Sequence, residues 1–178
     1  MCIIYFAPFR KTPKSRIIIL LICSGDHMII DLSPILRGEV STVKIEYEMS
    51  ETPDVPDVEF TKGCKVSGKV DNRAGYMTLS LHASLPYVSS CARCLEEVVG
   101  VFEIDIEEPL AVAGALNDED TDDYILIENN SIDCEAPINE AVILEFPLRL
   151  LCKEDCEGLC SMCGKNLNHG KCSCEKKE

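Results

Sequence analysis

The sequence predicts an α+β fold, in which an antiparallel sheet carries one main buried helix and a C-terminal cysteine-rich tail of the zinc-knuckle type. Three observations lead to this fold class. Several segments alternate between apolar and polar residues, a later segment is apolar on most sides, and eight of the twelve cysteines lie in closely spaced groups. Because 46% of the 178 residues are hydrophobic, the chain can bury a core, which argues against global disorder.

Residues 1–27 form an extension that we expect to lie outside the fold and to be dispensable. Basic residues at 10–16 precede an apolar run over 17–23, an order that loosely resembles a signal peptide. Seven apolar residues are far fewer than the ~20 that a membrane span needs. A self-consistent pattern begins at Met28, which is therefore a candidate for the true start.

The body, residues 28–151, is predicted to be the α+β core domain. Residues 29–31 are expected to form a short strand, and Ser33-Pro34 is typical of a single helical turn. Alternation predicts half-buried strands over 42–49, 64–70, 76–85 and 98–106, the second and third joined by a turn at 71–75. Residues 51–57 and the acidic residues 114–123 are predicted loops, and 136–150 is the predicted buried helix, ended or kinked by Pro147.

The charge is strongly acidic and unevenly distributed. The formal net charge is −14, and between Arg93 and Arg149 sixteen Asp and Glu residues occur with no Lys or Arg. Such a stretch repels phosphates and attracts basic partners, although an acidic solvated surface alone would look the same. No glycine-rich phosphate loop, nucleophile elbow or other catalytic set occurs, which favours a protein that is not an enzyme.

The cysteine spacing indicates metal ligation within residues 152–178 and at one earlier pair. Cys160 and Cys163 have the spacing of a zinc knuckle, and Gly164 permits the backbone turn that this needs. Eight thiolates are enough for two tetrahedral sites. The candidate ligands of zinc are Cys91, Cys94, Cys152 and Cys156 for one site and Cys160, Cys163, Cys172 and Cys174 for the other. Cys2, Cys23, Cys64 and Cys134 stand alone, and His169 is a redundant candidate.

Two other chemistries fit parts of this pattern. Cys91 and Cys94 could be the pair of a thiol–disulfide redox protein, with residues 95–97 opening a helix, but the flanking strands do not form βαβ units. The spacing of Cys156, Cys160 and Cys163 also occurs in radical iron–sulfur enzymes, which need a large scaffold after the motif. Only fifteen residues follow here.

These residues resemble the YceD family, named for large ribosomal RNA subunit accumulation. The resemblance lies in Ile30-Asp31-Leu32-Ser33 with Gly38-Glu39, in Cys91-Ala92-Arg93-Cys94-Leu95-Glu96, and in the tail Leu151-Cys152-Lys153-Glu154-Asp155-Cys156-Glu157-Gly158-Leu159-Cys160 followed by Cys163-Gly164-Lys165-Asn166-Leu167-Asn168 and Cys172-Ser173-Cys174. It implies a cytoplasmic bacterial or plastid accessory factor for large-subunit ribosomal RNA, encoded beside a small basic ribosomal protein. Shorter members keep the central pair and the pair after the apolar helix, which supports joining Cys91 and Cys94 to Cys152 and Cys156.

The charge favours a basic large-subunit ribosomal protein as the partner, with ribosomal RNA bound weakly or indirectly. Direct RNA contact would depend on a few local bases, which are Lys62, Lys65, Lys69 and Arg73, or Lys165, Lys171, Lys176 and Lys177. We expect the loop acids Asp118, Glu119, Asp120, Asp122 and Asp123 to be the most available for the basic partner. No membrane and no small-molecule substrate is expected.

Overall fold

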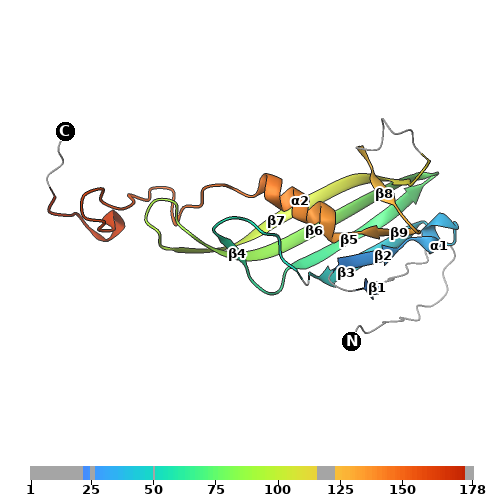
Figure 1. Ribbon diagram of the computed structural model, residues 1–178, viewed down its shortest axis with the longest axis horizontal. Coiled ribbons are helices and arrows are strands. Elements are labelled where there is room, and N and C mark those ends of the chain that lie inside the picture. The colour runs from blue at the N-terminus through green and yellow to red at the C-terminus, as the bar shows by residue number, and fades with distance from the viewer. Residues whose placement is uncertain (1–21, 25–26, 50, 116–122, 175–178) are drawn as a thin grey trace.

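A computed structural model describes residues 22–24, 27–49, 51–115 and 123–174 (Figure 1). A six-stranded sheet contains β3 (Thr42–Glu48), β4 (Val58–Phe60), β5 (Lys65–Arg73), β6 (Tyr76–Ser90), β7 (Glu97–Val112) and β8 (Ile125–Ile127). Its strand order is β3-β5-β6-β7-β8, and β4 pairs with β6. A three-stranded sheet, ordered β1-β2-β9, contains β1 (Ile22–Ser24), β2 (His27–Asp31) and β9 (Ser131–Asp133). The helices are α1 (Ser33–Leu36), α2 (Glu135–Glu145) and the 3₁₀ helix η2 (Leu167–His169).

The large sheet has one buried face and one exposed face, as the alternation predicted. In β3 the side chains of Val43, Ile45 and Tyr47 are buried, whereas Lys44 and the two glutamates are exposed. The same alternation continues through β5 and β6, where Leu79 to Leu85 bury every second side chain. Removing this apolar surface from water is the main stabilisation of the sheet.

The small sheet and α2 cover the buried face (Figure 1). Ile30 of β2, Ile132 of β9, and Ile138 and Val142 of α2 belong to one core with the large sheet. After α2 ends, the ring of Phe146 meets the rings of Phe60, Tyr87 and Phe102 edge-on, at centroid distances of 5.5, 5.2 and 5.1 Å. Such edge-to-face contacts fix the point at which the chain leaves the helix.

Two details of the predicted fold differ in the structure. The large sheet is mixed, because β8 pairs parallel to β7, and β4, β8 and β9 lie in segments where no strand was predicted. The predicted helix over 136–150 is present but shorter, and it is not buried on most sides. Ile143 and Leu144 are 58% and 76% exposed, since only one side of α2 packs on the sheet.

The predicted boundary at Met28 is also not where pairing begins. β1 lies within the predicted extension and pairs antiparallel with β2. Its backbone hydrogen bonds could not be predicted from the alternation of apolar residues. Residues 1–21 and the loop acids Asp118, Glu119, Asp120 and Asp122 lie outside the described residues. Among the helices that the structure describes, none is long and apolar enough to cross a membrane.

The hairpin of β6 and β7 positions the cysteine-rich region. The two strands pair without interruption from Met77 opposite Leu110 to Ser90 opposite Glu97. After α2 the chain returns along the molecule to the tip of this hairpin, and the tail continues beyond it (Figure 1). The backbone N–H of Ala92, at the tip, donates to the carbonyl of Leu150, so the returning chain is held at the turn.

Candidate metal centres

The first centre begins in the turn between β6 and β7. The backbone N–H of Cys91 donates to the carbonyl of Glu96 at 2.8 Å, and that of Leu95 donates to the carbonyl of Cys91 at 3.0 Å. This tight turn places Cys91 and Cys94 side by side, and both side chains are buried. The pair therefore presents two sulfurs to one point, as a zinc knuckle does.

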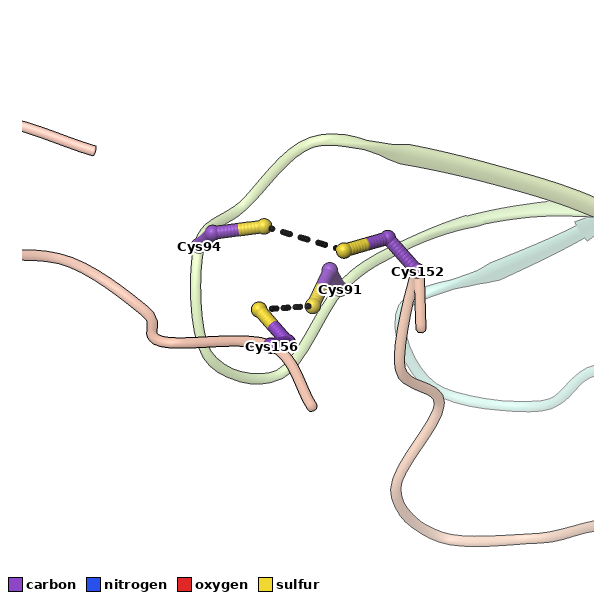
Figure 2. Close-up of side chains that lie close together, drawn as sticks. All are labelled: Cys91, Cys94, Cys152 and Cys156. Carbon is purple, nitrogen blue, oxygen red and sulfur yellow. Dashed lines mark hydrogen bonds between the residues drawn. The ribbon is translucent and has the colours of Figure 1, made fainter. Parts of the chain in front are cut away.

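The chain that follows α2 brings the other two sulfurs to the same point. Figure 2 shows Cys94 facing Cys152 and Cys91 facing Cys156, with Sγ–Sγ distances of 3.5 and 3.7 Å. All four sulfurs lie within 4.8 Å of one another, in one of the two groups of described residues that could hold a metal ion. A tetrahedral ion with metal–sulfur bonds of about 2.3 Å would hold its ligands about 3.8 Å apart, so the group fits such an ion closely.

The second centre lies entirely in the tail. The sulfurs of Cys160, Cys163, Cys172 and Cys174 also lie within 4.8 Å of one another, and the pair Cys160 and Cys172 is 3.3 Å apart. Cys163 is exposed and the other three are half-buried. The described cysteines are free thiols, because these separations are well above the ~2.05 Å of a disulfide.

The two knuckles share one backbone geometry. In the tail, Cys160 donates to the carbonyl of Lys165 and Gly164 donates back to Cys160, which repeats the bonds of the first knuckle. Gly164 has a φ of 70°, and the corresponding residue of the first knuckle, Leu95, has a φ of 62°. A leucine in the left-handed region is uncommon, and the turn overrides its preference. Residues 95–97, which the redox alternative placed at the start of a helix, instead complete this turn and begin β7.

Three side chains around the first centre were not identified from the sequence as functional. The guanidinium of Arg93 donates to the carbonyl of Cys156 at 2.9 Å, and the amide of Asn168 donates to the sulfur of Cys156 at 3.2 Å. Glu96 accepts from the thiol of Cys94. The donors Arg93 and Asn168 orient the segment and the sulfur of Cys156, whereas the contact of Glu96 exists only while Cys94 carries its proton. No signal in the spacing could have identified Asn168, because it depends on the path of the tail.

The tail packs against the first centre through η2. His169 Nε2 contacts a carboxylate oxygen of Glu96, and His169 belongs to neither cysteine group. The backbone N–H of Leu159 donates to the carbonyl of Arg93, and Gly158, with a φ of 75°, would place a Cβ only 3.0 Å from that oxygen. The second centre is thus held on the first by side-chain and backbone contacts.

Local hydrogen bonds favour the ionised form of some of the eight clustered sulfurs. Burial raises the pKa of Cys91, but backbone N–H groups, that of Arg93 foremost, outweigh it and lower the pKa to about 6. The side chain of Asn168 lowers the pKa of Cys156, and backbone N–H groups in the tail knuckle lower that of Cys160 to about 6. Burial raises the pKa of Cys94 to about 12, and the neighbouring sulfur of Cys163 raises that of Cys174 to about 12. Because metals bind the thiolate, a bound cation would favour ionisation of these remaining sulfurs.

The cysteines predicted to stand alone do so where the structure describes them. Cys64 and Cys134 are buried in the core, and burial raises the pKa of both thiols. Cys2 lies outside the described residues. The redox alternative is not favoured, because Cys91 and Cys94 share their site with two further thiols and lie in an antiparallel hairpin.

Comparison with known proteins identifies one family and several relatives. A family model described as "Large ribosomal RNA subunit accumulation protein YceD" matches residues 79–178. An uncharacterized protein of Mycobacterium tuberculosis is 41% identical over 81 residues, which are 44% of this chain and 39% of that protein. The YlbN protein of Bacillus subtilis is 25% identical over 121 residues, 64% of this chain and 70% of that one.

A plant relative carries the family name. The chloroplastic YCED homolog 1 of Arabidopsis thaliana, described as a large ribosomal RNA subunit accumulation protein, is 39% identical over 51 residues, 29% of this chain and 16% of that protein. The matched region thus spans about two fifths of the mycobacterial relative and less of the plant one. No solved structure matches the chain. The family model covers more than half of the sequence, including both cysteine groups, and the chain belongs to the YceD family of large ribosomal RNA subunit accumulation proteins.

Proposed function

We propose that this chain is a non-enzymatic accessory factor for the accumulation of large-subunit ribosomal RNA and for ribosome assembly, stabilised by two structural zinc ions. One observation carries the proposal: the family model spans all eight clustered cysteines, so the metal centres are part of the region that defines the family. Four thiol sulfurs in a closed group leave no open position for a substrate, which is the arrangement of a structural zinc site. Reduced thiols of this kind agree with a cytoplasmic protein.

Zinc supports this fold at a place where hydrophobic burial is weak. The end of the hairpin and the tail contain only a small apolar cluster, in which Val98, Leu151 and Leu159 surround three of the cysteines. Metal binding by cysteine-rich segments contributes directly to folding free energy, because the sites do not exist in the unfolded chain. Zinc would therefore hold the tail on the β6–β7 hairpin and leave the sheet faces for partners.

The partner that we propose is a basic large-subunit ribosomal protein, with RNA bound weakly or indirectly. A net charge of −14 opposes binding to phosphates. The bases of β5 are few, and Lys69 is already paired with Asp71. The acids of β7, by contrast, are unaccompanied by Lys or Arg anywhere between Arg93 and Arg149. The negative electrostatic field of these acids speeds their encounter with Lys- and Arg-rich surfaces.

Three measurements test the proposal. Elemental analysis of reduced, freshly purified protein should give two zinc ions per chain, and iron in place of zinc, or no metal, would contradict the zinc assignment. Cells lacking this chain should lose large-subunit ribosomal RNA relative to small-subunit RNA. Capture from lysate, with and without nuclease, should retain a basic ribosomal protein after RNA is removed. Loss of all capture on nuclease treatment would show that RNA is the direct partner.

A further inference from the structure

Along most of its length, one side of β7 has no strand beside it in the described part of the chain. On its first side β7 pairs with β6 along residues 97–110, and on its second side only residues 110–112 pair with β8. Within the described part of the chain, residues 97–109 therefore have no β-partner on the second side; we call this stretch the open edge. Its outward backbone N–H and C=O groups form a row to which another strand could hydrogen-bond.

Apart from its acidic side chains, the open edge lacks the features that normally prevent strand addition. The register between β6 and β7 continues one residue for one residue, so no bulge twists the edge away. β7 contains no lysine or arginine, and its single proline, Pro109, lies at the end next to β8. Long, regular edges without such features readily take up another strand.

The side chains beside the open edge indicate the charge of the occupant. Glu103, Asp105 and Glu107 alternate on the exposed face, where Asp105 contacts Nδ1 of His82 at 2.8 Å. Val99 and Val101 continue this row and are 69% and 56% exposed. An incoming strand would thus meet acids along most of its length and two apolar side chains near the cysteine turn.

A second copy of this chain is a poor occupant. Two open edges paired with each other would bring the acids of one copy close to those of the other, and like charges across neighbouring strands are destabilising. A strand with alternating lysine or arginine would instead place opposite charges there and gain cross-strand contacts. The charge of the open edge therefore selects a basic segment over self-association.

We propose that the open edge of β7 binds an extended segment of a basic protein as an added β-strand. The proposal rests on the proposed function in one respect, since it locates on this strand the surface that captures the basic ribosomal protein. It differs from the expectation that the loop acids around Asp118 do so, because here the main chain of β7 supplies the hydrogen bonds and the acids select the partner. Backbone pairing gives affinity and the alternating side chains give specificity.

The test uses the full-length, zinc-loaded protein and a synthetic peptide in which lysine and valine alternate. Amide hydrogen exchange measured by NMR should show that every second amide over 98–108 gains protection of about tenfold or more when the peptide binds, because the intervening amides are already bonded to β6. Peptide N-methylated at one set of alternate residues should lose binding, and peptide methylated at the other set should keep it. Binding that leaves β7 amides unprotected, or that ignores the position of the methyl groups, would overturn the proposal.

Paired variants separate the open edge from the general acidity of the chain. Glu103→Lys with Glu107→Lys should weaken peptide binding about tenfold or more, since two cross-strand attractions become repulsions. Glu46→Lys with Glu59→Lys makes the same change of charge on exposed strand residues on the other side of β6, and should alter binding less than about twofold. Equal losses in the two variants would mean that long-range charge alone binds the peptide, which refutes the strand-addition mode.

Two further readouts keep this proposal distinct from the proposed function. Sedimentation should show a monomer. A dimer that is lost in the Glu103→Lys, Glu107→Lys variant would mean that the edge binds a second copy instead. Peptide binding and amide protection are measured without ribosomes. If peptide binding and amide protection fail while ribosomal RNA still depends on the chain, only the edge proposal is refuted. If both succeed while ribosomal RNA is unaffected by loss of the chain, only the proposed function is refuted.

Discussion

Asn168 is expected to tune the metal affinity of the first centre through one hydrogen bond. Its side-chain amide donates to the sulfur of Cys156 at 3.2 Å, and its carbonyl oxygen accepts from the backbone N–H of Glu157 at 2.9 Å. The substitution Asn168→Asp keeps an oxygen for Glu157 and removes the donor to sulfur. It therefore separates the contact with the ligand from the contact that shapes the tail, and the carboxylate charge that it places beside the sulfur of Cys156 acts in the same direction as the lost donor.

The magnitude follows from the charge and exposure of this contact. A hydrogen bond to a charged group contributes about 1.5–3 kcal/mol, and Asn168 is half-buried, so the lower end of that range applies. Loss of a hydrogen bond to a metal ligand typically weakens metal binding by roughly 10–100-fold. We expect zinc at the first centre to bind about tenfold more weakly in Asn168→Asp, with the second centre unchanged.

Competition with a chromogenic zinc chelator measures the zinc affinity of the first centre with and without Asn168→Asp. The parent for this comparison is Cys163→Ser, in which the second centre has lost a ligand and the first is observed alone. Asn72→Asp is the matched control, because Asn72 likewise accepts from a backbone N–H, that of Gly75 at 2.9 Å, but lies near the end of β5. If Asn168→Asp holds zinc as tightly as Asn72→Asp, the hydrogen bond to sulfur does not contribute to metal affinity.

Three further outcomes are expected. Cys91→Ser and Cys163→Ser should each reduce the zinc content from two ions to one, as elemental analysis would show; loss of both ions from either variant would mean that the centres load only together. Leu95→Gly should leave the free energy of unfolding unchanged or raise it by about 1 kcal/mol in denaturant titrations, because Leu95 is 68% exposed at a φ of 62°, whereas Leu95→Val should lower it. Gly68→Ala should destabilise the sheet by about 1–3 kcal/mol, because the new Cβ would lie 2.2 Å from the backbone oxygen of Ser80; an unchanged melting midpoint would contradict that packing.

Much of the sheet was predictable because alternation is a local property of half-buried strands. The pattern in β3 and in the β5–β6 hairpin identifies which side chains face the core. It does not identify where strands end. β6 continues through Pro86 to Ser90, since β4 and β7 pair with that part of it, and the short strands β8 and β9 contain too few residues to alternate.

The composition of the candidate centres was also available from the sequence. Tight spacing of Cys160 and Cys163 by itself predicts a knuckle, because two ligands two residues apart can reach one ion. The conformation of Leu95 was not predictable, since leucine has no preference for positive φ and only the closed turn requires it. The contacts of Asn168 and His169 likewise depend on where the tail lies after a long separation in sequence.

The sequence by itself therefore determined the local properties of this protein: where the longer strands lie, which face of them is apolar, which cysteines lie in reach of a shared ion, and how acidic the body is. Tertiary structure alone decided the properties that depend on distant segments meeting. It brought the sulfurs of residues 152 and 156 to the tip of a hairpin about sixty residues earlier, and, within the described residues, it left one side of the acidic strand β7 without a paired strand over residues 97–109. Backbone hydrogen bonding is the physical reason, because every residue type offers nearly the same donor and acceptor, and the sequence does not record which of them find partners.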